Sequence, residues 1–432
     1  MSLHKFITDM LNIKPDNIDK IDSFDLSDGS VNLRIRLKAK KDICCPVCGG
    51  KVHIHGYSLR KLIHSTLVNR KCTIFYERRR FRCDSCEMTF FEENPFINSS
   101  ENVTFETKVN VLKDLKFVNN TYTSTAARYH LSATKVQRIF DAHVNIPRKP
   151  LPEVLSIDEH HFPESSYDSL YCCLLMDFED GTIIDVLPDR KKDYLAGYFT
   201  KVRLDTYDEK TGKSELDNVR YVSIDLYEPY KIIAQIYFPK ALICADSFHV
   251  LKHLTEAFRA VRLRCRRNTE DENLRYLLTK FKYIFSHGFN LDNDPKYNKR
   301  FKRRMNYRDM QTILFERFPD LKKAYELKEG YILFNESCCV QNAKEKLADQ
   351  IRQFADSGIS EYAGFYNLLI NWNEEIVHSF SAVSGRRINN SYIESRNNQL
   401  ERLMMNANGF RNFKRTRNRI LYCLNKKDTF KI

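Results

Sequence analysis

The stretch Val-Leu-Ser-Ile-Asp at residues 154–158 decides the fold class, because an apolar run of strand length ends there in the carboxylate of Asp158. Further apolar runs of similar length follow at 170–176, 182–187, 221–224 and 242–245. Near-continuous apolar runs are typical of strands that are covered on both faces. The sequence therefore predicts a domain of the α/β class.

Turn and helix signals between these runs indicate how the strands connect. Asp180-Gly181, between the second and third runs, favours a hairpin turn. Residues 191–201 and 228–238 are patterned as helices that join the later strands. The expected order is strand, strand, strand, helix, strand, helix, strand. We expect an exposed loop at 205–218, and about 250–390 is mainly helical and strongly basic.

The composition is that of a multidomain protein that acts on a polyanion. The chain has 432 residues, which corresponds to about three domains. It carries 70 Lys and Arg against 56 Asp and Glu, a formal net charge of +14. Such an excess favours nucleic acid as a partner, with solubility charge on an ordinary enzyme as the alternative. A small disulfide-stapled scaffold and a disordered chain are excluded.

The chain lacks the signals of export and of membrane insertion. No apolar run approaches the roughly 18 residues that a spanning helix needs. The first residues carry no basic stretch followed by an apolar one, so no secretory signal is visible. We expect a protein that stays in the cytoplasm and has no membrane partner.

Three prolines at 147, 150 and 152 are typical of a short, stiff linker and indicate a domain boundary. The cysteine-rich part lies well before this point, and a helical pattern covers 105–143. The predicted domains are a zinc-binding finger at 1–98, a helix-turn-helix at 99–147 and a catalytic domain at 148–432, which has a helical insertion at about 250–390.

Thirteen cysteines in a chain without an export signal are expected to serve as metal ligands or redox groups. Two Cys-x-x-Cys pairs allow four thiolates to reach one tetrahedral Zn²⁺ from two tight turns, for which Gly49 and Gly50 are suited. With no open coordination position, the expected role is structural; incidental cysteines or a redox pair are the alternative. We expect the basic segment between the pairs to form strands, Cys72 to be buried, and Cys44 to be a possible substitute for Cys45. The predicted zinc ligands are Cys45, Cys48, Cys83 and Cys86.

The segments 124–130 and 133–143 are patterned as two helices joined by a tight turn, and Ser132 is a good N-cap for the second helix. In such a motif, exposed Arg and Gln can read base edges in the major groove while Lys contacts phosphate. A plain helical hairpin is the alternative. The candidate DNA-contacting residues on the second helix are Lys135, Gln137 and Arg138.

Acidic residues follow two of the predicted strands and recur in a late helix. Asp158 follows the first apolar run, Asp225 follows the fourth, and Glu394 lies in a helical segment that begins near residue 390. A single Asp at a strand end is usually a turn residue. Strand ends brought together by the sheet would instead let these carboxylates bind Mg²⁺ and support an in-line displacement at phosphorus.

Taken together, several motifs resemble those of bacterial insertion-sequence transposases of the ISL3 family. The resemblance implies a DDE-type catalytic domain with an RNase H-like mixed sheet, interrupted by a helical insertion before the last glutamate. It also implies Mg²⁺ or Mn²⁺ as cofactor, double-stranded DNA as partner, a homodimer or larger synaptic complex, and a nucleoid-associated location. The motifs are SIDE at 156–159, VLPDR at 186–190, DSFHV at 246–250, YIESRNN at 392–398 and NGFRNF at 408–413.

The resemblance assigns roles to individual residues. Asp158 matches the first catalytic acid and Glu394 the last, although Ser395 stands where the family commonly has glycine. The second acid is expected after the fourth strand, which selects Asp225. Asp246 is the alternative, because it forms an Asp-x-x-His element with His249, which we interpret as an accessory residue.

A basic cluster follows Glu394 and is interpreted as a helix that holds DNA phosphates, with a solvated helix end as the alternative. The expected function is a transposase that binds the terminal inverted repeats of an insertion sequence and catalyses DNA cleavage and strand transfer. A sequence-specific regulator with an inactive domain is the main alternative, and a general nuclease is a third. The candidate phosphate-binding residues are Arg402, Arg411, Lys414 and Arg415.

Overall fold

The computed structural model describes residues 17–40, 42–67, 70–98, 101–162, 170–407 and 412–431, which form two compact units. Unit 1 comprises residues 1–147 and 399–432, and unit 2 comprises residues 148–398. The residues after 398 therefore pack with the N-terminal part of the chain, whereas the sequence-based division groups them with 148–398. Within the described residues, no helix is both long enough and apolar enough to cross a membrane.

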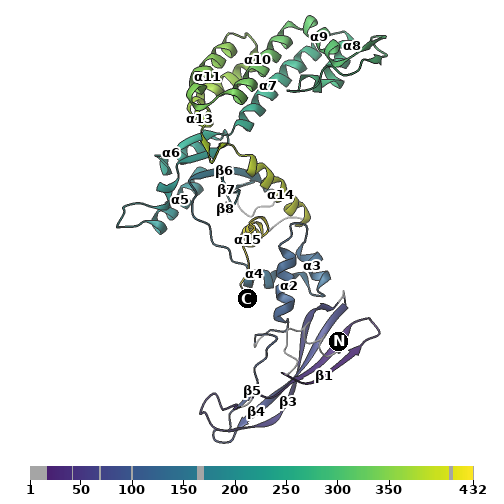
Figure 1. The fold of residues 1–432 in the computed structure, drawn as a ribbon, viewed down its shortest axis with the longest axis vertical. Helices are drawn as coiled ribbons and strands as arrows, with labels where there is room; N and C mark the ends of the chain where they lie inside the picture. The colour runs from purple at the N-terminus through teal and green to yellow at the C-terminus, as the bar shows by residue number, and fades with distance from the viewer. Residues whose placement is uncertain are drawn as a thin grey trace. The chain divides into compact units, whose positions relative to one another are not determined.

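Unit 1 begins with a sheet of strand order β1-β2-β4-β3, to which β5 adds by pairing with β4 (purple in Figure 1). Its core contains Leu33, Ile35, Leu62 and Ile74, and along β2 the buried Leu33 and Ile35 alternate with polar residues. The predicted strands between the two cysteine pairs are confirmed as the long antiparallel ribbon of β3 and β4. The strands are β1 (Ile18–Asp25), β2 (Val31–Leu37), β3 (Val52–Leu67), β4 (Arg70–Cys83) and β5 (Thr89–Phe91).

The rest of unit 1 is helical and consists of α2 (Phe105–Leu115), α3 (Tyr122–Arg128), α4 (Ala133–His143) and α15 (Phe413–Leu424). Side-chain caps fix where three of these helices begin: Thr104 for α2, Thr121 for α3 and Ser132 for α4. The predicted bounds of the second helix of the pair, and its N-cap, are confirmed.

Helix α15 is attached to α2–α4 through apolar packing and through hydrogen bonds to backbone groups. The ring of Tyr422 packs edge-on against Phe140, and its hydroxyl donates to the carbonyl of Leu112. The buried side chain of Asn418 donates to the carbonyl of Val144 and accepts from the amide of Ile146. The last helix of the chain is thus a fourth helix of the helical part of unit 1.

Unit 2 is built on a five-stranded sheet of order β10-β9-β6-β7-β8. The pairs β6–β7 and β7–β8 are antiparallel, whereas β6–β9 and β9–β10 are parallel. All five predicted strands are confirmed, and β9 and β10 have the predicted bounds. The strands are β6 (Val154–His161), β7 (Tyr171–Asp177), β8 (Ile183–Leu187), β9 (Tyr221–Ile224) and β10 (Leu242–Ala245).

The two predicted connecting helices are confirmed as α5 (Lys192–Thr206) and α6 (Glu228–Tyr237). The expected exposed loop at 205–218 is only partly a loop. It ends in a 3-10 turn at Glu215–Asn218, because Leu216 is buried in the core and Arg148 forms a salt bridge with Glu215. An apolar residue inside a polar stretch thus anchors its end.

Between β10 and the last helix of unit 2 lies a helical insertion, as predicted (green in Figure 1). It also contains two short hairpins that the sequence did not indicate, β11 (Lys296–Asn298) with β12 (Arg303–Met305) and β13 (Ala382–Val383) with β14 (Arg386–Arg387). Helix α14 (Ser391–Ala407) follows the second hairpin. The helices of the insertion are α7 (Ser247–Arg267), α8 (Glu272–Lys280), α9 (Tyr307–Arg317), α10 (Pro319–Ser337), α11 (Val340–Ala355), α12 (Ala363–Asn371) and α13 (Asn373–His378).

The two faces of the unit 2 sheet pack against different elements. Alternate residues such as Leu155, Val222 and Ile243 belong to a large core that also contains residues of α5, α6 and α7. On the opposite face, Val154 and Cys244 pack with Ile388, which lies between β14 and α14. The second face thus faces the segment that leads into α14.

Candidate metal centres

Three acidic residues lie at the same level on three neighbouring parallel strands of the unit 2 sheet. Asp225 and Asp246 come directly after β9 and β10. Asp158, which was expected to follow the first strand, lies inside β6, because β6 continues to His161 through its pairing with β7. In the strand register, Ile157 pairs with Ile224, and Ile224 pairs with Ala245. The residues that follow are Asp158, Asp225 and Asp246, so each carboxylate begins one strand spacing, about 4.8 Å, from the next. They lie on the face that packs with the segment leading into α14, and all three are buried.

One of these acids comes close to both another acid and a histidine. Ligand atoms of Asp158, Asp225 and His249 all lie within 4.8 Å of one another, a spacing that permits a shared metal ion. Nε2 of His249 is 3.3 Å from Oδ1 of Asp225 and 3.9 Å from Oδ2 of Asp246. His249 reaches this position because it lies in the first turn of α7, whose N-cap is Asp246.

The electrostatics of the cluster favour a cation. Burial, reinforced by the charge of Asp158, raises the pKa of Asp225 to about 10. Burial also raises the pKa of Asp246 to about 6. Within the described residues, Oδ1 of Asp225 and Oδ2 of Asp246 accept no hydrogen bond. Buried carboxylate oxygens that accept no hydrogen bond are available as ligands of a hard divalent cation, so the cluster is compatible with Mg²⁺ or Mn²⁺.

Hydrogen bonds from the α14 segment orient two of the acids. The side-chain amide of Asn397 donates to Oδ2 of Asp158 at 2.8 Å, and Oδ1 of Asp158 accepts from the amide of Glu159 at 2.7 Å. Oδ1 of Asp246 accepts from the backbone amides of Phe248 at 3.3 Å and of Asn390 at 3.4 Å. Asn397 belongs to the motif at 392–398, but nothing in the sequence predicted its contact with Asp158.

The predicted last acid, Glu394, lies within α14. Its side chain lies outside the part of the chain that the structure describes. Ile393, the residue before it, is buried, and Ser395, which stands where the resemblance leads one to expect glycine, is exposed.

Arg190, which the sequence did not mark as a candidate residue, has partners that adjoin two of the acids in sequence. Arg190 forms an ion pair with Glu159, the residue after Asp158. Its guanidinium lies 4.0 Å from the ring centre of Tyr171 and 4.6 Å from that of Tyr227, two residues after Asp225. Two rings and the carboxylate of Glu159 therefore hold the guanidinium of Arg190 in place.

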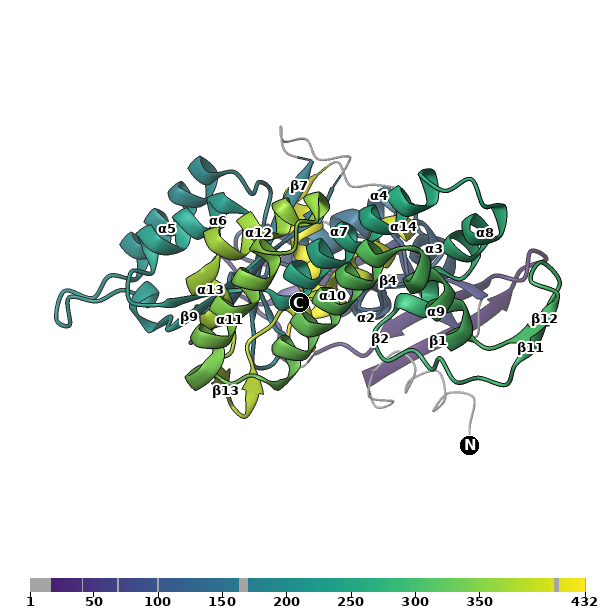
Figure 2. The ribbon, with the colours of Figure 1, turned by 90° about the horizontal axis from the view of Figure 1, so that it is seen from above.

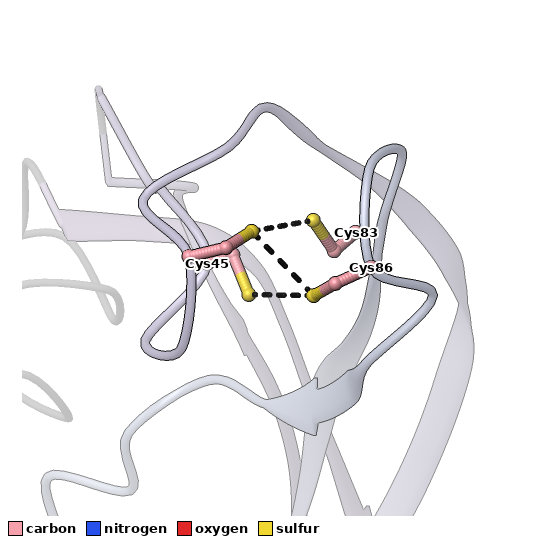
Figure 3. Close-up of side chains that lie close together, drawn as sticks. Cys45, Cys83 and Cys86 are labelled. Carbon is pink, nitrogen blue, oxygen red and sulfur yellow. Dashed lines mark hydrogen bonds between the residues drawn. The ribbon is translucent and has the colours of Figure 1, made fainter.

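The four predicted zinc ligands gather at the end of the β3–β4 ribbon. The Sγ atoms lie 3.6 Å apart for Cys45 and Cys86, 3.4 Å for Cys48 and Cys83, and 3.5 Å for Cys48 and Cys86. Zn–S bonds of about 2.3 Å in a tetrahedron would set the sulfurs about 3.8 Å apart, close to these values. Figure 3 shows Cys45, Cys83 and Cys86 turned toward one another. The cluster is compatible with Zn²⁺.

The two turns that carry the thiols have matching backbone geometry. Gly49 and Glu87, each one residue after the second cysteine of its pair, both have positive φ, +71° and +58°. The amides of Cys86 and Ser85 hydrogen-bond to Cys83 and lower the pKa of that thiol to about 6. Cys44 is exposed and is not a member of the cluster, and Cys72 is buried, as expected.

The predicted DNA-contacting residues lie in different environments. On α4, Arg138 is exposed while Lys135 and Gln137 are half-buried. Arg402 on α14 and Lys414 on α15 are exposed, whereas Arg415 pairs with Asp141 of α4 at 2.5 Å. Arg411 lies outside the described residues.

A comparison with protein families places this geometry in a known group. A family model of the ISL3 type, described as a transposase, matches residues 155–420, which is more than half of the chain. The match begins within β6 and includes the three aligned acids, the helical insertion and α14. A search of curated proteins found no match. Because transposases act on DNA, the family implies DNA as partner. The chain belongs to the ISL3 family of transposases.

Proposed function

We propose that this transposase binds the terminal inverted repeats of an insertion sequence and catalyses metal-dependent DNA cleavage and strand transfer. The observation that carries this proposal is the alignment of Asp158, Asp225 and Asp246 on three neighbouring parallel strands. Phosphoryl transfer depends on charge neutralisation and alignment more than on a protein nucleophile, and clustered carboxylates supply the sites for both.

The fold proposed for unit 2 is RNase H-like. Three antiparallel strands, β8, β7 and β6, continue into the parallel strands β9 and β10. The helical insertion then separates β10 from α14, in the order that the family resemblance implies. We assign residues 148–398 together with the remainder of α14 to the catalytic part of the chain, and the sheet and helices of unit 1 to a zinc-binding and helix-turn-helix part.

The proposed metal ligands are Asp158, Asp225 and Glu394. We prefer Asp225 to Asp246 as the second acid, because one oxygen of Asp246 already accepts two backbone hydrogen bonds as the cap of α7. Glu394 precedes Asn397 by three residues on α14, and residues spaced by three share a helix face. Asn397, one turn later on the same helix, contacts Asp158.

When bound, divalent ions would supply Lewis acidity to the attacking and leaving oxygens of the displacement. The residues of the chain orient the site. Asn397 donates a hydrogen bond to one oxygen of Asp158, and Nε2 of His249 lies close to Asp225. Arg190 forms an ion pair with Glu159, the residue after Asp158. The guanidinium of Arg190, held by Glu159 and two tyrosine rings, is a further proposed phosphate contact.

For the DNA contacts, we propose that the exposed face of α4 enters a major groove through Lys135, Gln137 and Arg138. The exposed cations Arg402 and Lys414 are the proposed phosphate contacts, together with Arg411. Arg415 is assigned a positioning role because it pairs with Asp141 of α4. The paired cutting of two element ends further leads us to propose a homodimer or larger assembly.

The test uses the full-length protein and DNA duplexes that end in the element's inverted repeats, with Mg²⁺ or Mn²⁺. We expect end-specific nicking and strand transfer by the unaltered protein. Asp158→Asn and Asp225→Asn should lose at least a hundredfold in cleavage rate while DNA binding persists. Asp193→Asn, which changes an exposed acid in the first turn of α5, is the matched control.

Other outcomes would overturn the proposal. Binding without cleavage under all metal conditions would indicate a regulator. Cleavage that ignores the sequence of the DNA end would indicate a general nuclease. Strand transfer that survives Asp158→Asn in Mg²⁺ would refute the catalytic assignment.

A further inference from the structure

The helical insertion of unit 2 contains a hollow that the proposed chemistry does not use. It lies between the β11–β12 hairpin and helices α8 and α9, which are neighbours in Figure 2. Its volume is about 350 Å³, within the range of roughly 300–1,000 Å³ typical of small-ligand sites. The hollow is therefore large enough for a single flat group of a larger ligand.

The walls of the hollow are aromatic. Tyr276 of α8, Phe281 after it, Tyr297 of β11 and Tyr307 of α9 all line it. The rings of Tyr276 and Phe281 are 5.5 Å apart, and those of Phe281 and Tyr307 are 6.2 Å apart, so three of the rings support one another. Tyr297 is different, because it is 62% exposed although it is a large ring on a strand. An exposed ring at the mouth of an aromatic hollow offers a stacking surface.

The hairpin beside the hollow is strongly basic, and three of its cations, Lys296, Lys299 and Arg300, line the hollow itself. Six of the nine residues from 296 to 304 are cationic and none is acidic. All six side chains are exposed. The nearby carboxylate of Asp292 is engaged by Arg308 at 2.6 Å. The cations are Lys296, Lys299, Arg300, Lys302, Arg303 and Arg304.

The hairpin is held in shape by its own polar groups. Oδ1 of the buried Asn298 accepts from the amides of Arg300 at 3.0 Å and Phe301 at 3.4 Å. The guanidinium of Arg300 lies 4.7 Å from the ring centre of Tyr276 and donates to the carbonyl of Glu272. The turn that carries the cations is thus attached to the aromatic wall of the hollow. A ligand in the hollow would therefore meet aromatic rings and positive charges at the same time.

We propose that this hollow binds one unstacked nucleotide of the DNA, with its base against Tyr297 and its flanking phosphates on the cations of the hairpin. The inference rests on the proposed function, because it takes DNA as the ligand. Exposed rings next to cations are the combination that binds single-stranded nucleic acid, since every base has a π face and every link a negative charge. A paired duplex keeps its bases stacked and offers only its phosphates to such a site.

The experiment measures binding of the full-length protein to two duplexes, one fully paired and one with a single unpaired nucleotide. The unpaired base is 2-aminopurine, whose fluorescence falls when it stacks on an aromatic ring. We expect at least fivefold tighter binding of the duplex with the unpaired base, together with quenching of that base. Tyr297→Ala should abolish both effects, and Tyr297→Phe should retain them. Tyr207→Ala, at an exposed tyrosine outside the hollow, should leave both unchanged.

Charge is tested separately. Lys296→Ala and Lys299→Ala, which remove cations that line the hollow, should weaken binding of both duplexes and reduce its salt dependence. Equal affinity for the two duplexes, or a preference that survives Tyr297→Ala, would overturn the inference even where end-specific cleavage is intact. A preference that depends on Tyr297 in a protein that cleaves no inverted repeat would instead support the hollow and refute the proposed function.

Discussion

The side-chain amide of Asn397 donates a 2.8 Å hydrogen bond to Oδ2 of Asp158, although the two residues lie 239 positions apart in the chain. The contact joins α14 to the middle of β6, and the helical insertion lies between the two in sequence. A second contact, from the amide of Asn390 to Asp246, joins the start of the same segment to the end of β10. The geometry of the acids therefore depends on how the insertion returns the chain to the sheet.

Removal of the Asn397 amide should slow the reaction without weakening DNA binding. In Asn397→Ala, Asp158 loses the donor that fixes one of its oxygens, and loss of such a supporting contact costs about 10–100-fold in activity. Cleavage rates at saturating DNA and separate binding measurements provide the readout. Asn398→Ala, at the exposed neighbouring position, is the control. An unchanged rate would mean that Asp158 is oriented by other groups.

The metal-free protein should become more stable when Asp225 is neutralised. The pKa of Asp225 is raised to about 10, so the folded state keeps a proton that the unfolded chain releases above about pH 4. The carboxyl therefore costs stability as the pH rises through this window. Asp225→Asn removes that cost, and its advantage in melting temperature should grow from pH 5 to pH 9.

The same melting experiments report on metal binding. Mg²⁺ or Mn²⁺ should raise the melting temperature of the unaltered protein, because the ion binds only the folded cluster. The ions should have little effect on Asp225→Asn. A variant that is less stable than the unaltered protein at every pH would contradict this account of the cluster.

Loss of the proposed zinc site should unfold the finger sheet of unit 1. Four thiolates arranged tetrahedrally stabilise a fold through metal binding, and Cys48→Ser removes one of them. We expect metal analysis to show about one Zn²⁺ per chain, lost in Cys48→Ser but kept in Cys44→Ser. Gly50→Ala should also weaken the site, because a Cβ there would lie 2.9 Å from Oγ of Ser85 and 3.3 Å from Sγ of Cys48.

Unit 1 should lose stability in mild acid because of His64. Burial lowers the pKa of this side chain to about 4, and its ring hydrogen-bonds to Thr104 at 3.0 Å. Between about pH 6.5 and 4, the unfolded chain binds a proton that the folded state excludes, so stability falls as the pH decreases. The shift corresponds to about 3 kcal/mol.

Unfolding by denaturant at pH 7 and pH 4.5 measures this effect. The loss should be smaller in His64→Gln, which keeps a hydrogen-bonding group but does not titrate. The exposed His55 provides the control His55→Gln, which should behave as the unaltered protein does. An equal acid loss in all three proteins would show that His64 is not the cause.

Asn418→Ala should destabilise unit 1 by about 1–3 kcal/mol, because it leaves the carbonyl of Val144 and the amide of Ile146 buried without partners. Thermal unfolding and binding to inverted-repeat DNA are the measurements. Lys414→Ala, at an exposed position of the same helix, should leave the unfolding unchanged. Equal stability of the two variants would mean that α15 contributes little to the helical part of unit 1.

The strands of unit 2 could be predicted closely because they are short apolar runs bounded by turn or helix signals. Tyr221–Ile224 and Leu242–Ala245 have the same bounds in the structure as in the sequence-based prediction. The cysteine cluster could be predicted equally well, because the spacing within each pair allows both thiolates to bind one metal ion. The position of Asp225 directly after its strand followed from the same reasoning, although its burial and raised pKa depend on the surrounding sheet. Asp158 was expected at a strand end as well, but β6 continues past it because the strand pairs with β7 as far as His161.

Contacts that join distant segments could not be read in this way. No sequence pattern predicts that Asn397, an asparagine within a polar motif, will hydrogen-bond to Asp158. The sequence likewise does not predict the packing of Arg190 against two tyrosine rings. The basic face of α15 was interpreted as a phosphate-binding surface. In the structure, Arg415 pairs with Asp141, a partner 274 positions earlier that no local pattern indicates.

The discontinuous make-up of unit 1 affects the order in which the protein can mature during synthesis. Helices α2–α4 leave the ribosome early, but α15, which covers them and satisfies their backbone groups, is made only after the whole of 148–398. In a nascent chain, the helical part of unit 1 therefore stays incomplete until α15 has left the ribosome. Prematurely terminated products should accordingly lack a completed module, and under the proposed function such fragments would not compete with the full chain for the ends of the element.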